Sequence, residues 1–160
     1  IRDSIGASTE PDMLHDFGNV ARECNEWGMP LMVMIYPRGK DIKNGYDVDL
    51  LKQCARAGME LGADMVKTSY TGDIDSFREV TQGCPVPVVV AGGPRMETTE
   101  QILEMVHGSI EAGGAGVAIG RNVFQAEDPT RMVRAIALIV HQDYEAKEAM
   151  KEAGLQGPQR

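Results

Sequence analysis

A lysine lies near the end of a short apolar segment, where a charged side chain is unusual. The stretch 63–72 reads as a short β-strand that carries Lys67 near its C-terminal end, followed by a small polar turn. A lysine inside an apolar strand costs free energy unless its ammonium group is paired, neutralised or extended to solvent. Burial favours the neutral amine, which is the form that attacks a carbonyl group. Lys67 is therefore either a structural lysine or a Schiff-base nucleophile.

Tyr36 and Arg38 end an earlier apolar run in the same way. A phenol at the end of the strand beside the lysine strand can be an aromatic plug, or it can exchange protons with a substrate hydroxyl group. Arg38 follows Pro37 and Tyr36 directly. Its guanidinium group is either a surface charge or a contact for an anion. The sequence leaves both alternatives open for each residue.

Two glycine turns indicate a phosphate site. Gly92-Gly93 and Gly120-Arg121 each follow an apolar segment, 28 residues apart. Glycine lets backbone N–H groups approach an anion closely, and arginine adds a bidentate donor. Any tight turn explains a single glycine pair. The two turns together, the second with an arginine, favour a phosphorylated substrate.

These residues need elements that bring them together, and the sequence predicts an alternation of helices and buried strands. Strands are expected at 31–35, 63–67, 87–90 and 116–119, and helices from Thr9, Asp47, Asp73, Thr98 or Thr99, and Asp128. The strands end at Tyr36, Lys67, Gly92 and Gly120, at intervals of 25 to 31 residues. This period is typical of βα repeats and a parallel sheet. Their continuous apolar runs predict burial on both faces.

Two α/β architectures fit this alternation, an open doubly wound sheet and part of a (β/α)8 TIM barrel. A full barrel has about 250 residues, and this chain holds four of the eight units. We expect residues 1–153 to be the C-terminal part of a barrel, about strands 5–8 with their helices, and 154–160 to be a flexible tail. Ile1 would then be the tail of a fourth strand. In either architecture the ligand binds at the C-terminal strand ends, where all the candidate residues fall.

Composition argues against several classes of partner and cofactor. The net charge is −8 with no basic stripe, so we expect no nucleic acid partner. The sequence contains no run of 18 apolar residues, so we expect no membrane-spanning segment. Three cysteines without CxxC spacing predict free thiols and a cytoplasmic protein. The three histidines lie on predicted helices without ligand spacing, so we expect no metal and no cofactor. The start at Ile1, with neither methionine nor signal peptide, suggests an incomplete chain.

Four motifs, in order, resemble the archaeal-type class I aldolase family. They lie within 27–141 and are Tyr36-Pro37-Arg38-Gly39, Val-Lys-Thr-Ser-Tyr-Thr-Gly-Asp at 66–73, Val-Ala-Gly-Gly-Pro at 90–94 and Ala-Ile-Gly-Arg-Asn-Val-Phe-Gln at 118–125. The resemblance implies that Lys67 is the Schiff-base lysine and Tyr36 the proton donor. It also implies a substrate site lined by Tyr36, Pro37 and Arg38, and a phosphate held by Gly92, Gly93, Gly120 and Arg121. The family's proton-accepting aspartate lies on the first barrel strand, which this chain lacks. The chain alone is therefore not expected to complete a catalytic cycle.

Within this family, two activities are implied. The first is a transaldolase of the archaeal 3-dehydroquinate route to aromatic amino acids, which takes a phosphorylated keto sugar and an aldehyde acceptor, L-aspartate 4-semialdehyde. Thr68-Ser69 after the lysine, and Met34 instead of tryptophan before the tyrosine, favour it. The alternative is a class I fructose-1,6-bisphosphate aldolase. A third hypothesis is a non-catalytic phosphosugar-binding fragment. Because a partial barrel exposes sheet edges, we also expect a homo-oligomer.

Overall fold

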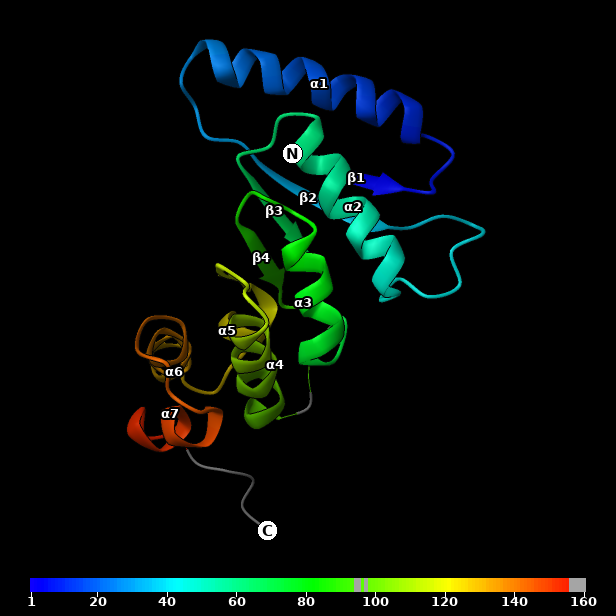
Figure 1. Cartoon of the computed structure of the whole chain (residues 1–160). Helices are drawn as coiled ribbons and strands as arrows, with labels where there is room; N and C mark the ends of the chain where they lie inside the picture. Colours follow the sequence, from blue (N-terminus) through cyan, green and yellow to red (C-terminus); the bar gives the residue numbers. More distant parts are fainter. Residues whose placement is uncertain (94–95, 97, 156–160) are drawn as a thin grey trace.

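The computed structural model describes residues 1–93, 96 and 98–155 of the chain. Within these residues, parallel strands and helices alternate from the N-terminus (Figure 1). The elements are β1 (Arg2–Ile5), α1 (Glu10–Glu26), β2 (Met32–Pro37), α2 (Val48–Glu60), β3 (Met65–Thr68), α3 (Ile74–Gln82), β4 (Val88–Ala91), α4 (Thr99–Glu111), β5 (Gly116–Ala118), α5 (Arg121–Phe124), α6 (Pro129–Gln142) and α7 (Ala146–Glu152).

The five strands form one parallel sheet in the order β1-β2-β3-β4-β5, so that each strand pairs with its neighbour in the sequence. This order, with a helix after every strand, is that of a (β/α)8 barrel, in which the chain turns steadily in one direction. A doubly wound sheet would reverse its strand order at one point. The structure therefore selects the partial TIM barrel from the two predicted architectures.

The sheet has one strand more than the four predicted. Arg2–Ile5 forms β1, which pairs with β2 so that Arg2 lies opposite Met34 and Ile5 lies opposite Pro37. The sequence prediction reached only Ile1 as the tail of a strand. It missed β1 because three of its four residues, Arg2, Asp3 and Ser4, are polar. Pairing with β2 outweighs this weak local preference for strand.

The two faces of the sheet differ along β2 and β3, which corrects the predicted burial on both faces for these strands, whereas all four residues of β4 are buried as predicted. Along β2 burial alternates, with Val33, Ile35 and Pro37 buried and the residues between them half-buried. A Cβ added to Gly58 of α2 would lie 2.8 Å from Val33 and 3.3 Å from Val66, so this face lies directly against α2. Among the described residues, no helix covers the opposite face. We call it the open face.

The hydrophobic core lies between the sheet and the helices. α1 packs on β1, α2 packs on β2 and β3, and α4 packs on β5, while α3 lies between α2 and α4. Figure 1 shows α2 and α3 running along one side of the strands. The largest fully buried side chains come from both layers. They are Phe17, Phe77, Ile35, Leu51, Leu103, Met132, Ile139, Val33, Val66, Val80, Val90 and Val106.

The predicted helix starts at Asp47, Asp73 and Asp128 are confirmed, since each carboxylate accepts a hydrogen bond from the backbone three residues on. Thr98 begins α4 with a complete capping box. Thr9 also precedes its helix, but its hydroxyl group donates to the Met13 sulfur instead of capping the backbone. The positions where these helices begin thus follow local sequence signals closely.

The end of the chain is only partly described. A short charged helix, α7, follows Tyr144 and packs on α4 and α6. Residues 156–160 of the predicted tail lie outside the described residues. Gly154 and Leu155 are described, and the Gly154 carbonyl accepts a 2.7 Å hydrogen bond from Arg131 Nη1. No described helix is long and apolar enough to cross a membrane.

Asp3 is a buried acid on the helical side of β1, where it pairs with Ile35. Its Oδ1 accepts a 2.6 Å hydrogen bond from the Ser4 backbone, and its Oδ2 has no hydrogen-bond partner. Burial raises the pKa of Asp3, and the nearby Glu10 carboxylate adds to the rise. The folded state therefore holds the Asp3 proton to a higher pH than the unfolded state does. Stability consequently falls as pH rises from the unfolded pKa through the folded one.

We expect Asp3→Asn to stabilise the chain at neutral pH by about 1–3 kcal/mol, because it removes a buried, half-satisfied charge. The gain should shrink as the pH falls through the folded pKa and disappear only below the unfolded value of about 3.9, where the parent carboxyl group is protonated in both states. Urea denaturation at several pH values measures it, with the exposed Asp16→Asn of α1 as the control. A gain that does not depend on pH would contradict this account of Asp3.

Candidate active site

Lys67 and Tyr36 project from neighbouring strands onto the open face. In the register of β2 and β3, Met34 pairs with Lys67, and Val33 pairs with Val66. Side chains alternate along a strand, so Met34, Tyr36 and Lys67 all lie opposite the helices. Strand spacing and rise place the Tyr36 and Lys67 Cα atoms about 8 Å apart. Both long side chains can therefore reach one substrate.

The strand neighbours of Lys67 on this face are apolar. Met34 lies beside it on β2, and Val89 lies beside it on β4. Within the described residues the Lys67 ammonium makes no hydrogen bond or ion pair. The structural alternative in which Lys67 pairs with an acid therefore finds no partner there. Lys67 is half-buried as a residue, and an amine without an acidic partner is available for covalent chemistry with a carbonyl group.

Tyr36 is held as a protonated phenol. Burial raises the pKa of Tyr36, while the positive charges of Arg38 and Arg2 partly oppose the rise. The Arg38 guanidinium lies 5.1 Å from the centre of the Tyr36 ring, a cation–π distance. Arg38 itself is exposed. It thus orients the phenol from the solvent side, and the phenol keeps its proton at neutral pH.

Two residues of this region lie on the other face of the sheet. Pro37 is buried on the helical side of β2 and pairs with Ile5. Its side chain therefore does not share the open face with Tyr36 and Lys67. Asp3 also faces the helices, so its carboxylate cannot exchange protons with a substrate on the open face. The Cys54 thiol on α2 lies in the same helical layer, where burial and the Asp3 charge raise the pKa of Cys54 to about 12.

The two glycine turns meet at the ends of β4 and β5. Arg121 Nη2 donates a 3.2 Å hydrogen bond to the Gly93 carbonyl, which joins the two turns directly. Gly93 has φ = +64°, which favours glycine, and a Cβ on Gly92 would lie 2.7 Å from the Ile119 side chain. Gly120 directly precedes α5, and Arg121 is its exposed first residue. The structure thus brings together all four residues of the predicted phosphate site. Pro94 of the third motif lies outside the described residues.

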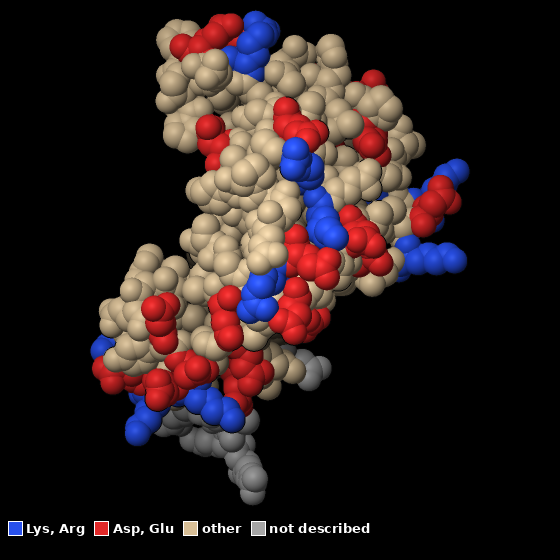
Figure 2. Space-filling model, viewed as in Figure 1, with Lys and Arg blue, Asp and Glu red and all other residues tan. Residues whose placement is uncertain are grey.

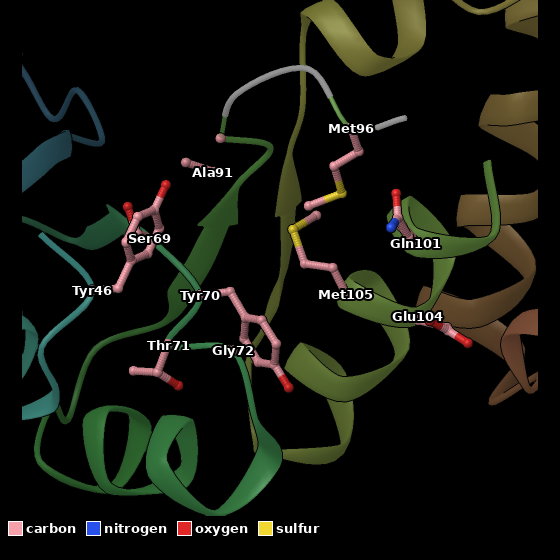
Figure 3. Close-up of a pocket in the computed structure, with 11 residues that line it drawn as sticks. Tyr46, Ser69, Tyr70, Thr71, Gly72, Ala91, Met96, Gln101, Glu104 and Met105 are labelled. Carbon is pink, nitrogen blue, oxygen red and sulfur yellow. The ribbon is translucent and has the colours of Figure 1, made fainter. Parts of the chain in front are cut away.

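A pocket of about 720 Å³ opens beside these strand ends. Ser69, Ala91 and Gly93 line it from the exits of β3 and β4, and Tyr46 lines it from the segment before α2. In Figure 3 the Met96 and Met105 side chains reach toward each other across the pocket, whereas Glu104 points away. Lys67 and Tyr36 do not line it, because the open face is not enclosed within this chain. Figure 2 shows the molecule hollowed on the side away from α2 and α3.

Sequence reasoning missed two contributors to this region. Tyr46 was not among the predicted site residues, and nothing in the sequence indicates that it faces the exits of β3 and β4. Asn122 was noted only as part of a motif, yet it is buried and bonds to Gly92. Its position directly after Gly120-Arg121 was the one available signal. Within the described residues, no cluster of three or more His, Cys, Asp or Glu could hold a metal ion.

Comparison with known proteins bears on these features. The family described as "DeoC/LacD family aldolase" matches residues 1–126, which include both candidate catalytic residues and the glycine turns. The chain belongs to this aldolase family. The membership confirms the class I aldolase resemblance that the four motifs carried.

Two curated relatives of this DeoC/LacD family aldolase match most of the chain. The 2-amino-4,5-dihydroxy-6-oxo-7-(phosphonooxy)heptanoate synthase of Streptomyces griseus is 40% identical over 151 residues, which are 94% of this chain and 55% of that protein. The 2-amino-3,7-dideoxy-D-threo-hept-6-ulosonate synthase 1 of Archaeoglobus fulgidus is 39% identical over 152 residues, with the same two shares. The chain thus spans just over half the length of these relatives.

A solved structure agrees with the fold of this family member. It is described as an archaeal fructose-1,6-bisphosphate aldolase with its catalytic lysine covalently bound to the carbinolamine intermediate of the substrate. The TM-score is 0.82 and the sequence identity 34%, over 87% of this chain and 57% of that one. The five-stranded sheet of the DeoC/LacD family aldolase described above is therefore part of a TIM barrel, as predicted.

Proposed function

We propose that this chain carries the lysine, phenol and phosphate-binding parts of a class I aldolase that acts on a phosphorylated keto sugar. The observation that carries the proposal is the register of β2 and β3, which sets Lys67 and Tyr36 side by side on one open face. The glycine turns lie at the same C-terminal strand ends, on β4 and β5, the next two strands of the sheet. Ligands bind at this end of a barrel.

The chemistry starts with attack of the Lys67 amine on the keto carbon of the sugar. The carbinolamine loses water to give an iminium ion, which withdraws electrons from the adjacent bond. When that C–C bond breaks, its electron pair moves into the iminium group, an enamine forms and an aldehyde leaves. The enamine then adds to an acceptor aldehyde, and water hydrolyses the new iminium ion. This last step releases the keto product and restores the free lysine.

Tyr36 is suited to move protons in these steps. Its phenol is protonated at neutral pH, so it can donate a proton as water leaves the carbinolamine. The Gly92-Gly93 and Gly120-Arg121 turns would hold the phosphate, away from the bond that breaks. Binding energy from this remote group would orient the keto carbon toward Lys67. The proton-accepting aspartate would come from outside this chain.

For the specific reaction we favour the transaldolase, with L-aspartate 4-semialdehyde as the acceptor and 2-amino-3,7-dideoxy-D-threo-hept-6-ulosonate as the product. The names of both curated relatives describe seven-carbon 2-amino keto acids, and one of these compounds is phosphorylated. The solved relative supports a second candidate, fructose-1,6-bisphosphate cleavage. A phosphosugar-binding fragment without turnover is the third. The predicted homo-oligomer and cytoplasmic location stay predictions.

Activity assays with different substrates distinguish these functions. The whole gene product that carries this chain is incubated with fructose 1,6-bisphosphate alone, and then with a phosphorylated keto sugar plus L-aspartate 4-semialdehyde. Transfer to the semialdehyde, with slow cleavage of the bisphosphate, supports the transaldolase. Efficient cleavage without transfer favours the aldolase. Sugar-phosphate binding without either reaction, and without a borohydride-trapped imine, would refute the proposed catalysis.

Arg121→Met should weaken binding of the phosphorylated substrate. A charge-assisted hydrogen bond contributes about 1.5–3 kcal/mol, so we expect KM to rise about 10- to 150-fold with a smaller change in kcat. The KM of Arg121→Lys should lie between those of the parent and Arg121→Met, because lysine keeps the charge but loses the bidentate geometry. Steady-state kinetics measures both, with the exposed Arg22→Met of α1 as the control. An unchanged KM in Arg121→Met would remove Arg121 from the phosphate site.

A further inference from the structure

Asn122 bridges both described ends of the segment that leaves β4. Its side-chain amide nitrogen donates a 2.7 Å hydrogen bond to the Gly92 carbonyl, and its amide oxygen accepts a 3.0 Å bond from the Met96 backbone N–H. The side chain is 4% exposed. An asparagine amide offers one donor group and one acceptor group, and here each satisfies a backbone group of the segment.

The backbone that Asn122 holds is the predicted phosphate-binding backbone. Gly92 has no room for a side chain, and Gly93 has the left-handed backbone conformation. Arg121, the residue before Asn122, donates to the carbonyl of Gly93. Consecutive side chains of α5 therefore bond to consecutive carbonyl groups after β4. Carbonyl groups turned toward α5 leave the amide N–H groups of the same turn free to point elsewhere, as anion binding by backbone requires.

We propose that Asn122 is a positioning residue that sets the geometry of the Gly92-Gly93 turn for the substrate phosphate. This inference rests on the proposed function and adds to it a residue for which no role was predicted. Asn122 acts through the backbone, because its buried amide is already engaged by Gly92 and Met96. It controls how well the turn binds phosphate and leaves the chemistry at Lys67 unchanged.

Asn122→Asp tests this role with minimal change of shape. The aspartate keeps an acceptor for the Met96 N–H, but it places an oxygen against the Gly92 carbonyl in place of the donor. Asn122→Ser is the second variant, because its hydroxyl group can still donate to one carbonyl group if the aspartate variant does not fold. Gln125→Ala, an exposed amide at the end of the same helix, is the matched control.

Two measurements on the whole gene product separate positioning from general structural damage. The first is the Kd for inorganic phosphate by calorimetry, and the second is borohydride trapping of an imine with dihydroxyacetone, which has no phosphate. We expect Asn122→Asp to raise the phosphate Kd roughly tenfold or more, with trapping at the parental level. The phosphate Kd of the serine variant should lie between those of the aspartate variant and the parent.

Three results would overturn the inference. A phosphate Kd that stays at the parental value in both Asn122 variants would remove the positioning role. Equal losses of phosphate binding and dihydroxyacetone trapping would assign Asn122 to folding alone. A parent protein that binds phosphate but forms no imine would refute the proposed catalysis and leave the role of Asn122 in phosphate binding intact. A parent protein that binds no phosphate would refute the role of Asn122.

Discussion

Lys67→Met is expected to abolish imine formation and to reduce turnover by about 10⁴-fold or more, because the nucleophile is lost. Methionine fits the site, since Lys67 lies between Met34 and Val89 on the open face. The variant should therefore keep its fold, which thermal unfolding checks. The large loss would then report on chemistry and not on stability.

Borohydride trapping followed by mass spectrometry makes this test specific. With a phosphorylated keto sugar, the parent should carry one reduced adduct on the peptide that contains Lys67, and Lys67→Met should carry none. Lys151→Met, an exposed lysine on α7, is the control and should retain the adduct. An adduct on any other lysine of the parent, or a Lys67→Met variant that still forms one, would disprove the assignment.

Tyr36→Phe is expected to lower turnover by about 10²–10⁴-fold, which is the usual contribution of a general acid or base. The ring and its contact with Arg38 remain, so the change removes only the hydroxyl group. Imine trapping should persist in this variant, since the amine is intact, although the imine should form more slowly. The two residues are thus separable, because Lys67→Met loses the adduct and Tyr36→Phe keeps it.

The pH dependence of the parent gives an independent check on Tyr36. Burial raises the pKa of Tyr36, so the phenol should stay protonated, and activity that depends on it should fall only above about pH 10. Tyr144→Phe, which lies between α6 and α7, is the control and should leave both turnover and the pH profile unchanged. A Tyr36→Phe variant with parental turnover would exclude the proton-transfer role.

Local sequence determined much of the fold. Apolar runs, glycine stops and aspartate caps located β2 to β5 and α1 to α4 to within a few residues, because these signals act between neighbours along the chain. The interval between strands predicted βα repeats, and the position of Lys67, Tyr36 and the glycine turns at strand ends predicted a shared site. Four short motifs in order were enough to identify the family.

Tertiary structure decided what depends on contacts between distant segments. β1 exists because β2 offers it a pairing partner, although Arg2, Asp3 and Ser4 favour no strand by themselves. Which face of a strand the helices cover follows from packing, so only the structure placed Pro37 on the helical face and Tyr36 on the open face. Likewise Asn122 and Gly92 are 30 residues apart in sequence and meet only in the folded sheet.

The candidate site shows the same division. Residue types and spacing alone predicted an amine nucleophile, a phenol and a phosphate-binding backbone, since chemistry depends on which groups are present. The folded sheet sets Lys67 between Met34 on β2 and Val89 on β4. The structure also shows that, among the described residues, the Lys67 ammonium has no acidic partner. Long-range pairing fixes distances and orientations that no local pattern encodes.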